Sequence, residues 1–132
     1  MIEETEQEKL IRHLRGVRPV VINARHGGFG LSHEARVLYL DRSRVDYTVE
    51  DRESRFSTER YGPQILVNDE PFSDRVIPRD DPVLVSVVCE LGERSWGVHA
   101  ELKIVEIPAA VKWQIEEYDG REWVAEVHQT WN

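Results

Sequence analysis

The chain has 132 residues, with 25 acidic and 17 basic side chains, giving a net charge of −8. We expect a single domain over residues 1–132, large enough to bury about two thirds of its extended surface. Its one cysteine, Cys89, excludes an internal disulfide framework. The negative charge disfavours broad nucleic-acid binding, and no apolar run is long enough to cross a bilayer. With an acidic start unlike a secretory signal, we expect a cytoplasmic protein.

Residues 1–16 predict an N-terminal helix. Leu10, Ile11 and Leu14 share one side, acidic residues come first and basic residues last, and Gly16 ends the pattern. Residues 19–24 form a short, β-branched apolar run that predicts a buried strand.

A glycine loop follows this strand, and a helix follows the loop. Gly27-Gly28-Phe29-Gly30 is succeeded by apolar residues at helical spacing, so we predict a helix near residues 31–41 with Ser32 as its cap. The unit is therefore strand, glycine loop, helix.

Residues 41–78 are expected to be a charged insertion and loops. Val45, Tyr47 and Val49 alternate with polar residues, which indicates an edge strand, and residues 64–67 could supply its neighbour. Residues 68–78 are rich in turn formers and predict a loop.

Residues 82–91 predict a buried helix despite their many valines. Asp81 can cap it, Pro82 sits where a helix tolerates proline, and Gly92 follows the last apolar residue. Residues 100–107 alternate and end at Pro108, which predicts a strand.

The C-terminal residues predict a β-hairpin. A two-residue turn at Asp119-Gly120 would set Trp123 opposite Glu116 and mix both faces. A three-residue loop, 118–120, would instead pair Ile115 with Trp123 and place every apolar residue on one face, so we expect that register.

These elements predict an α/β (α+β) single domain. Its mixed β-sheet contains the strands 19–24 and 100–107 as central neighbours, together with the C-terminal β-hairpin. Two to three helices flank the sheet.

Three motifs occur in order. They are N-A-x-x-G-G-F-G-L-S from Asn23, R-x-D-P from Arg79, and I-V-E-I-P from Ile104 running into W-x-I-E-E-Y-D-G. Over roughly residues 20–36 and 78–131 the chain resembles a family of short, uncharacterised bacteriophage proteins. The resemblance implies a viral origin, and hence the host cytoplasm, without a settled activity. Family members often have a cysteine and an aromatic residue where this chain has Arg25 and His26, which argues against a required thiol.

The glycine loop is the main candidate for a ligand-binding site. Consecutive glycines before a helix let backbone amides approach an anion, and Arg25 and His26 would add positive charge. The alternative is that the glycines only make a tight turn, since the loop matches neither the P-loop nor the Rossmann spacing. The expected ligand-binding residues are Asn23, Arg25, His26, Gly27, Gly28, Phe29, Gly30 and Ser32.

Other kinds of site have weaker support. Ser32 is not framed as Gly-x-Ser-x-Gly, and a helix cap explains it. The five histidines show no metal-binding spacing, so we expect no metal, no cofactor and no assigned catalytic residue. Trp113, Trp123 and Trp131 could stack on a base, but the inward face of a hairpin is the expected place for them.

Three functional hypotheses follow. The first is a small-molecule binding protein of phage type that captures an anionic, nucleotide-derived ligand, such as a host defence signal, and can form a homo-oligomer. The second is an acidic protein-interaction module that inhibits or redirects a basic host protein. The third is a nucleotide-cleaving hydrolase with His26 as general acid or base.

Overall fold

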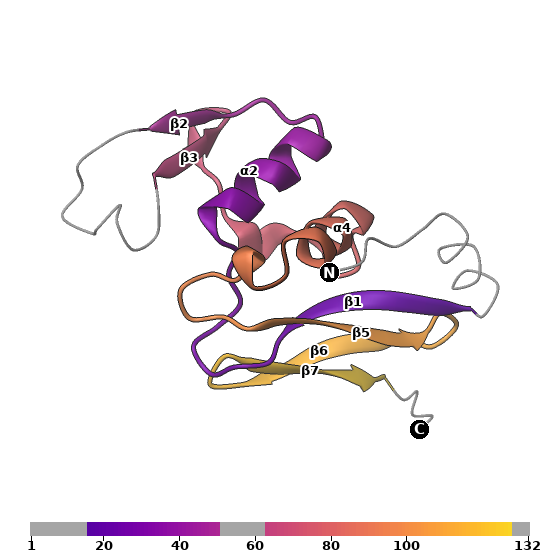
Figure 1. Ribbon diagram of the computed structural model, residues 1–132. Helices are drawn as coiled ribbons and strands as arrows, with labels where there is room; N and C mark the ends of the chain where they lie inside the picture. Colours follow the sequence, from indigo (N-terminus) through magenta and orange to yellow (C-terminus); the bar gives the residue numbers. More distant parts are fainter. Residues whose placement is uncertain (1–15, 51–62, 128–132) are drawn as a thin grey trace, which may run out of the picture.

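The computed structural model describes residues 16–50 and 63–127 (Figure 1). The helix predicted over residues 1–16 lies outside them, apart from Gly16 itself. The strands are β1 (Val17–Asn23), β2 (Thr48–Glu50), β3 (Gln64–Val67), β4 (Glu70–Pro71), β5 (Leu102–Pro108), β6 (Trp113–Tyr118) and β7 (Arg121–Glu126). The α-helices are α2 (His33–Arg42) and α4 (Pro82–Leu91). This composition confirms the predicted α+β single-domain class.

Both α-helices begin and end close to the predicted residues. The Ser32 hydroxyl accepts a hydrogen bond from the Ala35 amide at the start of α2, and the Asp81 carboxylate accepts one from the Val83 amide at the start of α4. Gly92 ends α4 with a φ of 57°. Capping side chains satisfy amides that the first helical turn leaves without partners, and this is why the sequence fixes these boundaries.

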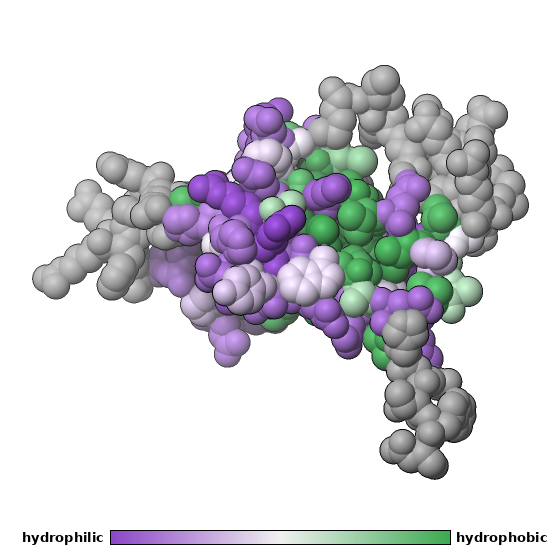
Figure 2. Space-filling model, turned by 90° about the horizontal axis from the view of Figure 1, so that it is seen from below, coloured by the Kyte–Doolittle hydropathy of each residue, from purple (hydrophilic) through white to green (hydrophobic). Residues whose placement is uncertain are grey.

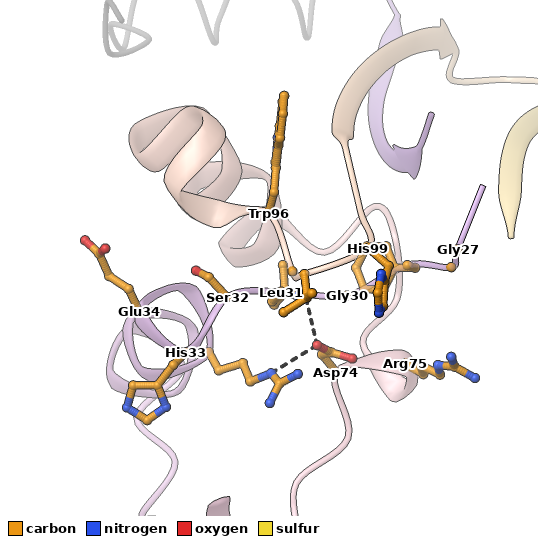
Figure 3. Close-up of a pocket in the computed structure, with 15 residues that line it drawn as sticks. Gly27, Gly30, Leu31, Ser32, His33, Glu34, Asp74, Arg75, Trp96 and His99 are labelled. Atoms are coloured by element: carbon orange, nitrogen blue, oxygen red, sulfur yellow. Dashed lines mark hydrogen bonds and ion pairs between the residues drawn. The ribbon is translucent and has the colours of Figure 1, made fainter. Parts of the chain in front are cut away.

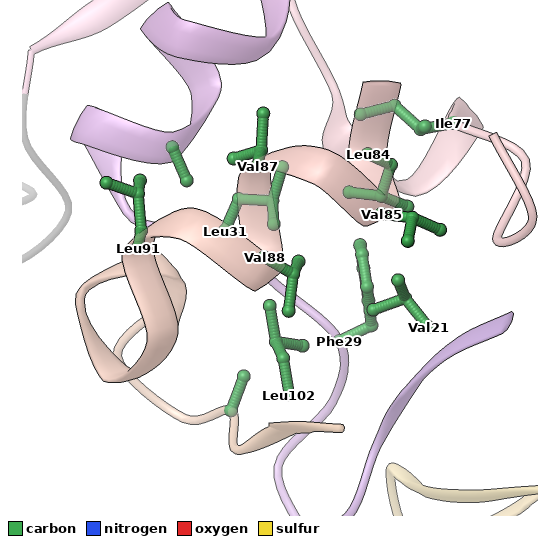
Figure 4. Close-up of a cluster of buried hydrophobic side chains, with 12 residues drawn as sticks. Val21, Phe29, Leu31, Ile77, Leu84, Val85, Val87, Val88, Leu91 and Leu102 are labelled. Carbon is green, nitrogen blue, oxygen red and sulfur yellow. The ribbon is translucent and has the colours of Figure 1, made fainter. Parts of the chain in front are cut away.

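The main core lies between the two helices and one face of the β1–β5 pair. These strands are antiparallel, with Val21 opposite Ile104 and Asn23 opposite Leu102. Figure 4 shows side chains of α4 meeting Val21, Phe29 and Leu102. The strand predictions and their pairing as neighbours are confirmed.

The other face of β1 is covered by the C-terminal hairpin. Val20 and Ile22 point away from Val21 and are also buried. In Figure 1 the helices, the β1–β5 pair and the β6–β7 hairpin follow one another as three layers. The hairpin forms its own two-stranded sheet, so the strands are divided among small sheets instead of sharing one, and the pairs in the described residues are antiparallel.

The predicted register of the hairpin is wrong. Asp119 and Gly120 form a two-residue turn with φ angles of 50° and 84°, and Trp123 lies opposite Glu116. The prediction assumed that every inward position is apolar. One inward position is instead Glu122, which is buried and fully paired, and this register turns Trp123 outward.

A third sheet lies apart from these layers. β2, β3 and β4 pair in sequence order, which confirms residues 64–67 as the neighbour of the edge strand. Residues 68–78, predicted as loop, also contain β4 and the 3-10 turn η1 (Asp74–Val76). Within the described residues, no helix has the length and apolar character needed to span a membrane.

Candidate ligand-binding cleft

Asn23 joins the end of β1 to three other segments through a buried side chain. Its amide nitrogen donates to the carbonyls of Arg25 (2.6 Å) and Gly120 (2.7 Å), while its amide oxygen accepts from the Glu101 backbone (3.0 Å). These bonds hold the glycine loop, the hairpin turn and the start of β5 together. The side chain is therefore committed to structure and has no donor left for a ligand.

Arg79 and Glu122 complete the same network. The two guanidinium nitrogens Nη1 and Nη2 lie 2.5 and 2.9 Å from the carboxylate oxygens, and the carboxylate also accepts from the Asn23 amide at 2.8 Å. The Arg79 carbonyl accepts from the Val21 amide on β1. The guanidinium carbon of Arg79 lies 3.6 Å from the centre of the Phe29 ring, which is a cation–π contact. Phe29 is thus an anchor of the loop in the core.

The hairpin turn packs directly on the glycine loop. The Gly27 amide donates to the Asp119 carbonyl at 3.1 Å. A Cβ added to Gly120 would collide with the backbone nitrogen of Gly28 and would come within 2.8 Å of the Gly27 nitrogen. This close approach explains a glycine in the turn and shows that part of the loop has a structural role.

The glycine loop also borders a cleft of about 530 Å³ (Figure 3). The cleft is lined by residues 27–32, by the first turn of α2, by η1 and by residues 96–99. Segments far apart in the sequence therefore form its walls. The walls meet closely: the Gly97 amide donates to the Gly30 carbonyl at 2.8 Å, and a Cβ on Gly97 would lie 2.7 Å from the Gly30 carbonyl carbon.

Five of the eight predicted ligand-binding residues line this cleft and three do not. The five are Gly27, Gly28, Phe29, Gly30 and Ser32. Asn23 is buried in the network. Arg25 and His26 are exposed elsewhere, with the His26 ring in edge contact with Tyr118. The positive charge that the sequence placed beside the glycines thus lies outside the cleft.

The cleft takes its charge from other residues. Asp74 is buried and accepts from the Leu31 amide (2.8 Å) and from Arg36 Nε (3.1 Å), as Figure 3 shows. Glu34 pairs with Arg94. Arg75, next to Asp74, forms no ion pair with any described residue, and its Nη2 would lie 3.6 Å from a Cβ on Gly28. Once these internal pairs are made, Arg75 is the guanidinium left to meet a ligand.

Some backbone amides of the glycine loop are available to bind a ligand. The amides of Gly27 and Leu31 already have acceptors. Those of Gly28, Phe29 and Gly30 donate to no acceptor within residues 16–50 and 63–127. An anion in the cleft would satisfy amides of this kind.

Two histidines and a tryptophan complete the walls. A Cβ on Gly27 would lie 2.8 Å from the Cβ of His99, so only a glycine lets this loop approach the histidine. His33 Nδ1 is buried and has no hydrogen-bond partner among the described residues. Trp96 packs on the main core, and in Figure 3 it points away from Arg75 and His99. Its side chain therefore packs on the core and also lines the cleft.

The sequence analysis missed Arg36, Asp74, Arg75 and His99. Arg36 had a signal, because it follows the Ser32 cap by four residues and so lies on the first turn of the predicted helix. Arg75 and His99 lie in segments that sequence patterns do not place relative to the glycine loop. Their approach to it depends on tertiary packing.

Comparisons with other proteins gave no match among family models, curated proteins or solved structures. Among the described residues there is no cluster of three or more histidine, cysteine or carboxylate side chains suited to a metal ion. The site is therefore interpreted from its own geometry.

Proposed function

We propose that this protein binds a small anionic ligand in the cleft beside the glycine loop. The observation that carries the proposal is the Arg75 guanidinium, which has no partner among the described residues and lies beside a loop whose amides are partly free. The net charge is −8, so an unneutralised cation in a concave site is a local exception to the surface as a whole.

A phosphoryl group is the anion that this arrangement suits best. It can accept from a forked guanidinium and from backbone amides at the same time. The first turn of α2 adds the positive end of a helix dipole to the same wall. Arg36 is held by Asp74 and serves to shape the wall.

The volume of the cleft, about 530 Å³, lies within the usual range for small-molecule sites. A nucleotide-derived ligand is consistent with that size. The resemblance to bacteriophage proteins leads us to propose capture of a host signalling nucleotide, in which tight binding suffices and no turnover is needed. The homo-oligomer expected from the sequence stays a prediction.

The test is to identify what copurifies with the protein and to measure its affinity in two matched variants. Denatured protein is examined by mass spectrometry, and cyclic and ADP-ribose-type nucleotides are screened by thermal shift. Arg75→Gln removes the free cation of the cleft, whereas Arg25→Gln removes an exposed arginine outside it. We expect Arg75→Gln to weaken binding by about tenfold to a hundredfold, because a hydrogen bond to a charged group contributes about 1.5–3 kcal/mol.

The expected result for Arg25→Gln is an affinity within about twofold of the parent protein. Equal losses in both variants would show that general surface charge is responsible, and no binding across the panel would remove the proposal. The mass of the released ligand distinguishes storage from hydrolysis, because a stored ligand leaves the protein with its mass unchanged. In the hydrolysis hypothesis, His26 is the general acid or base.

A further inference from the structure

Asp74 uses one carboxylate oxygen for the protein and leaves the other open to the cleft. Oδ2 accepts from the Leu31 amide at 2.8 Å and from Arg36 Nε at 3.1 Å, whereas Oδ1 accepts from no described residue. The side chain lines the cleft although it is only 8% exposed. Among the described residues, His33 Nδ1 is the one buried polar side-chain atom sealed from solvent without a partner. Oδ1 is therefore accessible, and Asp74 is a buried acceptor that a ligand can reach.

The open oxygen lies close to the backbone amides that would hold an anion. The Leu31 amide, which bonds Asp74, directly follows the amides of residues 28–30, which have no acceptor among the described residues. Consecutive Cα atoms are about 3.8 Å apart, so these loop residues lie within about 4–11 Å of Leu31. In Figure 3 the open oxygen points away from Arg36, toward the side of the cleft where Arg75 lies. One small molecule can therefore reach the free amides and Asp74 together.

The charges around Asp74 favour a neutral donor on the ligand. A carboxylate oxygen only accepts hydrogen bonds, so the ligand must donate. Arg36 already neutralises Asp74, and the next residue in the chain, Arg75, brings a second guanidinium to the same wall. An ammonium group would add a third cation there. A hydroxyl group donates without adding charge, and its bond to an ionised oxygen is among the stronger hydrogen bonds.

A buried acceptor discriminates between ligands in a way that apolar surface does not. Apolar surface does occur in this protein, and Figure 2 shows an area of it on the hairpin side, bordered by hydrophilic residues. An apolar pocket distinguishes poorly between two molecules that differ by one hydroxyl group. A site built to bond that hydroxyl rejects the analogue without it, because the buried acceptor is then left unpaired.

We propose that Asp74 determines the specificity of the cleft by accepting a hydrogen bond from a sugar hydroxyl of the ligand. The inference rests on the proposed function, since a phosphoryl group held by the glycine loop and Arg75 brings the sugar beside Asp74. The cleft then prefers ribonucleotides to analogues that lack the ribose hydroxyls. Such an analogue would displace water from Oδ1 without supplying a donor.

The test compares adenosine 5′-phosphate with its 2′,3′-dideoxy analogue by titration calorimetry in three proteins. Asp74→Asn can keep its oxygen on Leu31 and Arg36 while its NH₂ group faces the cleft, so the open acceptor becomes a donor. Glu90→Gln is the matched control, because Glu90 pairs with another arginine of α2, Arg42, outside the cleft. The ratio of the two affinities within each protein cancels the general effect of the lost negative charge.

We expect the parent protein and Glu90→Gln to bind the ribonucleotide at least tenfold more tightly than the dideoxy analogue, the effect of one hydrogen bond to a charged group. In Asp74→Asn this ratio should fall below threefold. In the parent protein, the ribonucleotide should also shift the carboxyl carbon resonance of Asp74 more than the analogue does, a readout that does not depend on how a variant folds.

Two failures are distinguishable. Equal affinities in the parent protein, or an equal ratio in Asp74→Asn and the parent, would overturn the role of Asp74 while leaving the anion site in place. Binding of neither nucleotide would remove the proposed function together with this inference.

Discussion

Arg79 and Glu122 form a bidentate ion pair between the loop before α4 and strand β7, with both nitrogen–oxygen distances at or below 2.9 Å. The same carboxylate accepts from the Asn23 amide, and the same arginine covers Phe29. Asn23, Arg79 and Gly120, one residue from each of the three sequence motifs, thus meet in one network. Their shared role in the structure is to hold the glycine loop against the hairpin.

Replacing Glu122 with Gln should strongly destabilise the fold. The change leaves the Arg79 guanidinium, whose side chain is 15% exposed, without its counter-charge, a defect that costs about 3 kcal/mol. Urea unfolding followed by circular dichroism measures the loss. Glu117→Gln, on the facing strand but exposed, is the matched control and should cost less than about 0.5 kcal/mol. Similar losses in both variants would mean that the pair contributes little.

Alanine at Gly120 should be far more damaging than alanine at Gly16. Both glycines have positive φ, 84° and 67°, so both substitutions carry the same kind of backbone strain, about 1 kcal/mol. Only at Gly120 would the new Cβ meet the loop backbone, since nothing lies within 4 Å at Gly16. Chemical unfolding should show the Gly120→Ala loss to exceed that of Gly16→Ala by at least 1–2 kcal/mol, a steric cost. Equal losses would show that the turn does not press on the loop.

Gly97→Ala should open the cleft wall. Its Cβ would come within 2.8 Å of the Gly30 carbonyl carbon and oxygen, so the two loops must separate. The expected cost is about 1–3 kcal/mol of stability. Hydrogen exchange of the Gly97 amide, which donates to Gly30, should accelerate more than that of the Gly27 amide. Unchanged exchange at Gly97 would contradict this close contact.

Alkaline pH should weaken the fold through Tyr39. Burial, together with its hydrogen bond to Asp81 at 2.7 Å, raises the pKa of Tyr39 from 10.0 to about 12. The unfolded chain loses this proton near pH 10 while the folded chain keeps it, so the stabilisation is complete below pH 10 and is lost between pH 10 and 12.

Tyr39→Phe removes this pH dependence and should cost about 1 kcal/mol at pH 8. Urea unfolding between pH 8 and 11 should give a steeper decline for the parent protein than for Tyr39→Phe. Tyr47→Phe is the comparison, because Tyr47 also bonds an aspartate but lies at the surface. Parallel pH profiles for the parent and Tyr39→Phe would refute this assignment.

The sequence predicted those parts of the fold that local chemistry determines. Asp81, Pro82 and Gly92 identified α4 although its valines favour a strand, and Ser32 identified α2. The hairpin register failed because Glu122 is an inward carboxylate, and its partner Arg79 is 43 residues away. A rule that sorts apolar residues onto one face cannot anticipate a buried ion pair.

The candidate site was likewise predicted only where local sequence determines the structure. The glycine loop was predicted from sequence and does border the cleft, but the cations next to it in the chain, Arg25 and His26, lie elsewhere. Arg75 reaches the glycine loop because η1 packs beside that loop. No local sequence pattern predicts this packing. Proximity in sequence was a poor guide to proximity in the cleft.

The contact between Asn23 and Glu122 joins residues 99 positions apart. During synthesis, β1 emerges from the ribosome long before its carboxylate partner does. The glycine loop therefore cannot complete these contacts until Glu122, the second residue of β7, has been translated. Over that interval the backbone edges of β1 lack their partner strand and are open to pairing with other chains.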